Sequence, residues 1–153
     1  GADMSRFPSA QHLASWVGLC PGNNQSGGRR LSGRTRKGNK YLRSTYVEAA
    51  HGAARKKGSY TKAQYHRLAG RRGKKRALVA VAHGLMEASY IVLSRKVPYR
   101  DLGGNYFDTL NPERLKQRMV ARLEALGYQV ALTPALTVPI LAEAARARQL
   151  QPA

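Results

Sequence analysis

The sequence predicts a small, mainly α-helical domain with a long loop rich in glycine and arginine after the first helix. Apolar residues recur at three- and four-residue spacing in several long segments, as they do on helices that pack against a core. Helix start and stop signals bracket these segments. The composition, 42% hydrophobic over 153 residues, suits one domain with a modest core, and we expect at most one short extended segment.

The first helix is predicted to begin after Ser9, a favourable N-cap, and to reach about Val17. Leu13, Trp16 and Val17 form its apolar face. Residues 18–37 are expected to be the long loop, because they are rich in glycine and contain few apolar residues. Loops of this length inside a compact domain are often functional or disordered.

Three further helices are predicted at residues 37–57, 59–68 and 74–94. Glycines separate them, and Ser59 is a favourable cap for the second. Residues 97–110 contain a proline and two glycines and are expected to form another loop.

The clearest helix signal lies near the C-terminus. Asn111 is a favourable N-cap, Pro112 occupies the first helical position, and Gly127 follows the last turn. This helix is predicted to bury one apolar stripe, formed by Leu115, Met119, Leu123 and Leu126.

The predicted elements divide the chain into three regions. Residues 1–110 form the main domain, and residues 111–133 form a helix with a short extended segment, 128–133, packed on it. Residues 134–153 form a tail that we expect to be partly disordered.

Charge is the unusual property of this sequence. There are 27 Lys and Arg against 8 Asp and Glu, a formal net charge of +19. Seventeen of these cations fall between Arg29 and Arg76, where Glu48 is the single acid. Such a block repels itself in the free protein, so it predicts a polyanionic partner. Nucleic acid fits better than an anionic membrane, because membrane binding usually requires an amphipathic helix with large apolar residues opposite the charge.

Several classes of protein are disfavoured by the residues that are missing. Cys20 is the single cysteine, so an intrachain disulfide and a cysteine-based zinc site are excluded, and a reducing cytoplasm fits. The histidines and carboxylates are scattered, so we predict no metal site in this chain and no self-contained metal nuclease. No phosphate-binding nucleotide loop is present. We expect no signal peptide, and the longest apolar run, 77–82, is too short to span a bilayer.

The segment 24–30, Asn-Gln-Ser-Gly-Gly-Arg-Arg, is the candidate for chemistry. Ser26 precedes two flexible glycines, and the arginines beyond it are suited to stabilise charge on a phosphate under attack. Spacing alone favours an ordinary loop serine, because Ser-Gly-Gly is common in linkers. Four tyrosines interleaved with the charge are candidates to stack on unpaired bases or to be half-buried helix residues: Tyr41, Tyr46, Tyr60 and Tyr65.

Several ungapped segments, in order along the chain, resemble the C-terminal domain of transposases of the insertion-sequence 110/116/902 family. The resemblance covers residues 3–110 and lies in the segments 3–10 (DMSRFPSA), 13–22 (LASWVGLCPG), 25–28 (QSGG), 32–43 (SGRTRKGNKYLR), 71–77 (RRGKKRA) and 98–103 (PYRDLG).

The resemblance implies a recombinase built from two halves. In that family an N-terminal RuvC-like domain holds the acidic metal ligands, expected to bind magnesium, and the C-terminal domain supplies a serine nucleophile. Halves from different subunits form a composite site that exchanges DNA strands through a phosphoserine link, guided by a structured RNA. Ser26 matches the nucleophile, with Ser32 as the fallback. Cys20 stands where many relatives have alanine, and we interpret it as a packing substitution.

The RuvC-like carboxylates are absent from these 153 residues. We therefore expect a fragment that binds nucleic acid but does not complete recombination alone. It would need the N-terminal half, other subunits and magnesium, in the bacterial cytoplasm and on the nucleoid when bound to DNA. The rival interpretation is a non-catalytic basic RNA-binding protein. A tyrosine recombinase using Tyr106 or Tyr128 is less favoured, because both are more simply explained as core or turn residues.

The predicted nucleic-acid contacts fall into three groups. The first would clamp phosphates near the scissile bond: Arg29, Arg30, Arg34 and Arg36. The second would extend the contact along a helix: Lys37, Asn39, Lys40 and Arg43. The third would form a second patch that faces RNA: Arg71, Arg72, Lys74, Lys75 and Arg76.

Overall fold

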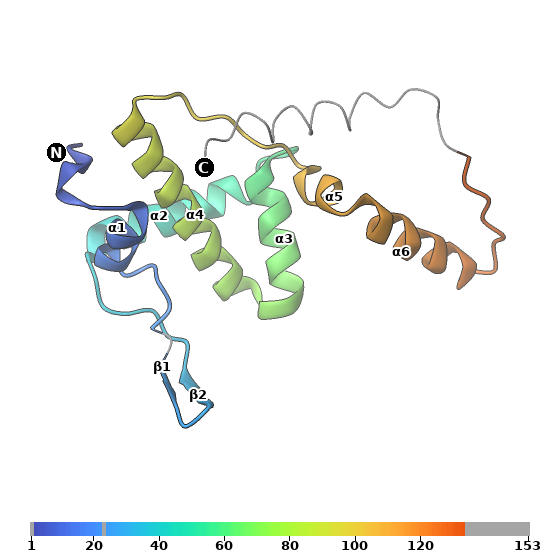
Figure 1. Ribbon diagram of the computed structural model, residues 1–153, viewed down its shortest axis with the longest axis horizontal. Coiled ribbons are helices and arrows are strands. Elements are labelled where there is room, and N and C mark those ends of the chain that lie inside the picture. Colours follow the sequence, from blue (N-terminus) through green and yellow to red (C-terminus); the bar gives the residue numbers. More distant parts are fainter. Residues whose placement is uncertain (1, 23, 134–153) are drawn as a thin grey trace. The chain divides into compact units, whose positions relative to one another are not determined.

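A computed structural model describes residues 2–22 and 24–133, without the side chain of Arg30. The described chain is mainly α-helical, as predicted (Figure 1). Its elements in order are the 3₁₀ helix η1 (Met4–Arg6), α1 (Ala10–Val17), β1 (Asn24–Ser26), β2 (Arg29–Ser32), α2 (Lys40–Ala53), α3 (Tyr60–Arg72), α4 (Lys74–Arg95), α5 (Tyr106–Leu110) and α6 (Pro112–Glu124). The described residues fall into two units, one ending at residue 104 and the other beginning at residue 105.

Side-chain caps explain where most of the long helices begin. The side chain of Ser9 accepts a hydrogen bond from the N–H of His12 at the start of α1. Asn39 caps α2, Ser59 caps α3 and Asn111 caps α6 in the same manner. These bonds satisfy backbone donors that have no partner inside the helix. Helix α4 differs, because Gly73 precedes it and offers no side-chain cap.

The core of residues 1–104 is built around α4, which packs against α1, α2 and α3 (Figure 1). The buried residues that form this core cluster are Leu13, Ala14, Val17, Leu19, Ala50, Val81, Ala82 and Met86. The alanines allow the helix backbones to approach closely, so the core is small in volume. By length and apolar composition, α4 is also the one helix in residues 2–22 and 24–133 that qualifies as a membrane span. The same composition is expected of a central helix that neighbours cover on several sides.

A strap without helix or strand, residues 96–104, follows α4 and is attached to the start of α3 by Asp101. Its Oδ1 accepts hydrogen bonds from the N–H of Tyr60 and the N–H of Gly103, both at 2.8 Å. The carboxylate also lies at the positive end of the α3 dipole, where a negative charge is favourable. Asp101 therefore explains part of the 98–103 motif as a structural clip.

Replacing Asp101 by alanine should lower the free energy of unfolding by about 1–2 kcal/mol, because two backbone N–H groups lose their acceptor. Replacement by asparagine keeps an oxygen acceptor and should cost less than half as much. Urea unfolding followed by circular dichroism measures both. Equal stability of the alanine variant and the parent protein would show that the strap is held by other contacts.

The extended structure lies elsewhere than predicted. Residues 128–133 contain no strand, whereas the predicted loop 18–37 contains the antiparallel pair β1 and β2. The short helix α5 also occupies part of the predicted loop 97–110. Strands of three and four residues, polar except for Leu31, carry no apolar alternation, so their pairing leaves no periodic signal in the sequence.

The buried stripe predicted on α6 is wrong. No residue of α6 is buried, and Met119, Leu123 and Leu126 are 45%, 43% and 68% exposed. Periodicity identifies residues that share a helix face but does not identify what covers that face. In the described part of residues 105–133, the helix next to α6 is α5, which is too short to cover the stripe. The predicted tail, 134–153, lies outside the described residues.

Candidate nucleic-acid interface

The candidate serine lies on a β-hairpin that projects from the helices of residues 1–104 (Figure 1). Gly27 and Gly28 form the two-residue connection, with φ values of 55° and 75°. Positive φ at both positions is typical of the hairpin turn whose twist matches that of the strands, and it strongly favours glycine. The Gly-Gly pair therefore produces a tight turn rather than a flexible linker.

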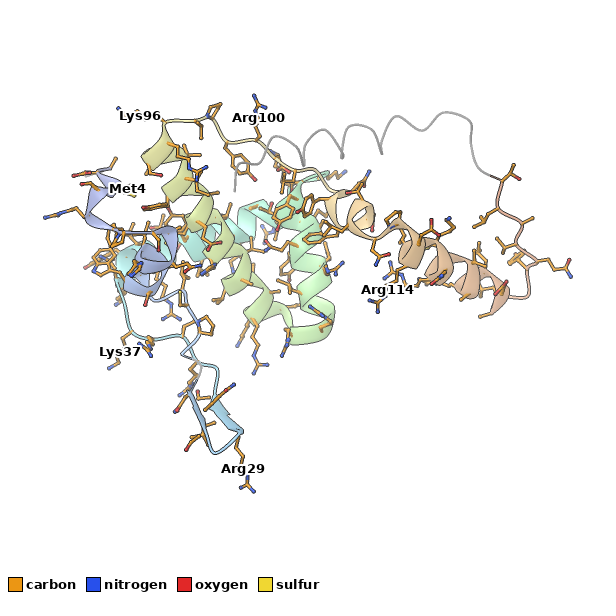
Figure 2. All side chains as sticks on the ribbon, in the orientation of Figure 1. Met4, Arg29, Lys37, Lys96, Arg100 and Arg114 are labelled. Atoms are coloured by element: carbon orange, nitrogen blue, oxygen red, sulfur yellow. The ribbon has the colours of Figure 1, made fainter. Side chains whose placement is uncertain are left out.

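Ser26 is exposed, at the end of β1 next to this turn. Its partner across the ladder is Arg29, the first residue of β2. Residues directly opposite each other point to the same face, with Cβ atoms roughly 4.5–5.5 Å apart. Arg29 lies at the hairpin tip (Figure 2) and is exposed as well. A hydroxyl and a guanidinium thus share one solvent-facing surface.

The base of the hairpin is narrow and attached to α1. Pro21 forms a bridge with Thr35, and the N–H of Gly22 donates to the carbonyl of Arg34 at 2.8 Å. Below this bridge, Gly38 packs on the backbone at the end of α1. A methyl group there would overlap the carbonyl of Val17. The bridge and this glycine contact form the neck that joins the hairpin to the helices.

Ser32, the fallback nucleophile, has different surroundings. It is half-buried, and its Oγ accepts a hydrogen bond from the backbone N–H of Arg34 at 3.2 Å. Ser26 makes no such bond within the described residues. Its hydroxyl is therefore the more accessible of the two.

A groove of about 1230 Å³ lies between the base of the hairpin and the corner where α3 meets α4. Its cationic lining comes from two distant parts of the sequence. Arg34 and Arg43 come from the neck and from α2, while Arg72, Lys75 and Arg76 come from the end of α3 and the start of α4. Its apolar lining includes Leu19, Pro21, Leu31, Leu68 and Val79. The fold therefore joins two basic clusters that appear separate in the sequence.

A second hollow, of about 530 Å³, continues along α2 and α4. It shares Arg43, Lys75 and Val79 with the first groove. Lys40 and His51 line it on the α2 side. Because the two hollows share walls, we treat them together as the basic groove.

Residues 2–66, which contain the hairpin and α2, match the family model of the transposase IS116/IS110/IS902 family. This segment belongs to that transposase family. No curated protein and no solved structure gives a significant match to the chain. Ser26 and Ser32 both lie in the matched segment, whereas α4 and the cluster at residues 71–76 lie beyond it.

Only some of the predicted contact residues in this segment line the basic groove. Arg36 and Lys37 are exposed near the neck but do not line the basic groove; Figure 2 shows Lys37 beside the hairpin base. Asn39 has a structural role, because its side chain accepts a hydrogen bond from the N–H of Leu42 and caps α2. The side chain of Arg30 lies outside the described residues.

The remaining predicted cations, Arg71 and Lys74, are exposed on the α3–α4 corner outside the groove lining. The four tyrosines that were candidates for base stacking differ in burial. Tyr46 and Tyr65 pack against the core, whereas Tyr41 is 82% exposed beside Lys40. Tyr60 is half-buried at the start of α3.

Five polar residues of the basic groove were not predicted as site residues: Thr35, Ser44, His51, Gln64 and His83. The Oγ1 of Thr35 accepts a hydrogen bond from Arg43 Nη2 at 2.7 Å, which holds that guanidinium at the groove. Nothing in the composition of residues 18–37 indicates this contact, because it depends on the path of the hairpin. Only His83 had a signal in the local sequence, because Glu87 follows it by one helical turn. Its Nδ1 lies 3.6 Å from Glu87 Oε2.

Cys20 contacts the same histidine, with its sulfur 3.7 Å from His83 Nε2. Burial, with a smaller contribution from Glu87, raises the pKa of the Cys20 thiol. The sulfur therefore remains protonated at neutral pH and is a poor nucleophile. This state fits the packing role predicted for Cys20.

Proposed function

We propose that this chain is the serine-bearing domain of a DNA transposase, in which Ser26 is the nucleophile for strand cleavage and exchange. The observation that carries the proposal is the exposed pair of Ser26 and Arg29, opposite each other at the hairpin tip. The family of the segment 2–66 makes DNA the substrate to test.

In the proposed reaction the Ser26 oxygen attacks a DNA phosphorus atom. The bond from phosphorus to one sugar oxygen breaks, the serine proton passes to water, and the departing sugar oxygen gains a proton. The product is a phosphoserine link. Attack on this phosphorus by the sugar hydroxyl of a second strand releases Ser26 and completes the exchange. Arg29 would stabilise the charge on the phosphate oxygens as the bond to serine forms.

The rest of the composite site would come from outside this chain. No group of three or more His, Cys, Asp or Glu side chains that could hold a metal exists within residues 2–22 and 24–133. We therefore assign no step on this chain to a metal. The magnesium ligands implied by the family resemblance would belong to a RuvC-like half, and a structured guide RNA would select the DNA. The intact enzyme would act on the nucleoid in the bacterial cytoplasm.

The proposal is tested by trapping the covalent intermediate. An intact recombinase that contains this domain is incubated with its labelled DNA junction and denatured, and the attached peptide is identified by mass spectrometry. We expect DNA attached to Ser26. Attachment to Ser32 would move the nucleophile to the groove wall. An absence of covalent DNA would favour the non-catalytic RNA-binding protein.

A further inference from the structure

We infer that the basic groove binds an unpaired nucleic-acid strand, at a site separate from the Ser26 tip. This inference rests on the proposal that the chain binds nucleic acid, and it specifies which form of nucleic acid the groove binds. It does not depend on which residue cleaves DNA. Its basis is the juxtaposition of Arg34 and Arg43 with Arg72, Lys75 and Arg76 around the partly apolar basic groove.

The positive charges of the groove favour an anionic ligand. Arg72, Lys75 and Arg76 are exposed, and none of them forms an ion pair with a carboxylate of the described residues. Arg43 is held by a neutral partner, the hydroxyl of Thr35. Like charges gathered around one hollow repel one another until an anion enters.

The positions of Lys75 and Arg76 oppose the stability of their own helix. Both lie in the first turn of α4. That turn contains no acidic residue, and the helix has no side-chain cap at this end. The helix dipole makes this end positive, so cations there are unfavourable. Helix stability therefore does not account for them, whereas binding of an anion at the groove does.

The size of the groove favours a polymer. The first hollow, about 1230 Å³, already exceeds the roughly 300–1,000 Å³ typical of small-molecule pockets. The second hollow continues it past Arg43 and Lys75 towards Lys40. A phosphodiester chain supplies repeated negative charges along such a path.

The apolar lining favours an unpaired strand over a duplex. Leu31 and Leu68 line the groove together with the cationic side chains, and Leu31 is 63% exposed. A duplex keeps its base faces stacked inside and would offer only phosphates and base edges to this surface. An unpaired strand can place its phosphates against the cations and its base faces against leucine and the planes of arginine.

The test is binding of the 153-residue chain to labelled oligonucleotides of about 12 nucleotides, measured by fluorescence anisotropy. The probes are unpaired DNA, unpaired RNA of the same sequence, and the DNA duplex of that sequence. We expect both unpaired strands, or one of them, to bind more tightly than the duplex. Whichever unpaired strand binds more tightly identifies the natural ligand of the groove as DNA or RNA. Tighter binding of the duplex would overturn the inference.

A matched pair of double variants locates the site. Lys75→Ala with Arg76→Ala removes two groove cations, and Lys56→Ala with Lys57→Ala removes two exposed cations outside it. The first should weaken unpaired-strand binding about tenfold or more and reduce the salt slope by about 1.4, at roughly 0.7 per phosphate contact. The second should weaken binding less than about threefold. Equal losses would show that the groove is not the site.

The groove variant also has a built-in folding control. Alanine favours helix, and removing two cations from the start of α4 relieves an unfavourable interaction with the dipole. Its thermal midpoint should therefore equal or exceed that of the parent protein while its affinity falls. An affinity loss accompanied by a lower midpoint would instead assign these residues to folding. Because Ser26 is unchanged, covalent trapping in the intact recombinase reports on the nucleophile separately.

Discussion

Replacing Ser26 by alanine in an intact recombinase that contains this domain should reduce strand exchange at least about 10³-fold, because no other group takes the place of a lost covalent nucleophile. Nucleic-acid binding should change less than about twofold, since the substitution removes a hydroxyl and no charge. Single-turnover exchange with a labelled junction measures the first quantity, and fluorescence anisotropy measures the second.

Two further variants give this prediction its controls. Ser32→Ala removes a half-buried hydroxyl that bonds its own neighbouring backbone and should leave exchange nearly unchanged. Arg29→Lys keeps the charge opposite Ser26 but loses the two-pronged grip on phosphate, so exchange should fall while binding persists. If Ser32→Ala abolishes exchange and Ser26→Ala does not, the nucleophile lies in the groove and the role of the hairpin tip is wrong.

The helices of this chain were largely predictable because their end signals are local. Ser9, Ser59 and Asn111 were predicted as caps, and each accepts the expected backbone N–H. The side-chain cap of α2, Asn39, was instead assigned to nucleic acid because it lies among cations. A cap and a phosphate contact have the same short polar side chain, so the sequence alone does not separate them.

The hairpin was not predicted, for a physical reason. Its stabilising features are the positive φ values at Gly27 and Gly28 and the bridge between Pro21 and Thr35. A glycine pair fits a flexible linker and a tight turn equally well in composition. Only the pairing of the flanking strands distinguishes the two, and that pairing involves polar residues without alternation.

The candidate interface was predicted in composition but not in arrangement. The dense block of cations at residues 29–76 was evident, yet Arg43 and Lys75 were assigned to different surfaces. Their meeting depends on α3 returning the chain so that the start of α4 lies against α2. Such a juxtaposition comes from tertiary packing and leaves no mark in spacing along the sequence.

The neck that joins the hairpin to the helices has little room for change. Gly38 lies against the backbone of Val17 and Gly18 rather than against side chains. Backbone atoms cannot rotate away as a flexible side chain can. The position of Ser26 relative to the helical core therefore depends on a residue that has no functional group.

Gly38→Ala should lower the free energy of unfolding by about 2 kcal/mol or more, because the added methyl group overlaps the end of α1 and must displace it or the hairpin. The matched control is Gly70→Ala within α3, where nothing lies within 4 Å of the added carbon. That variant should be stabilised by roughly 0.5–1 kcal/mol, because alanine loses less conformational entropy on folding than glycine. Urea unfolding of both variants measures the difference. In the intact recombinase, Gly38→Ala should also slow strand exchange, since the hairpin that carries Ser26 is displaced. A Gly38→Ala protein as stable and as active as its parent would show that the neck does not position the serine.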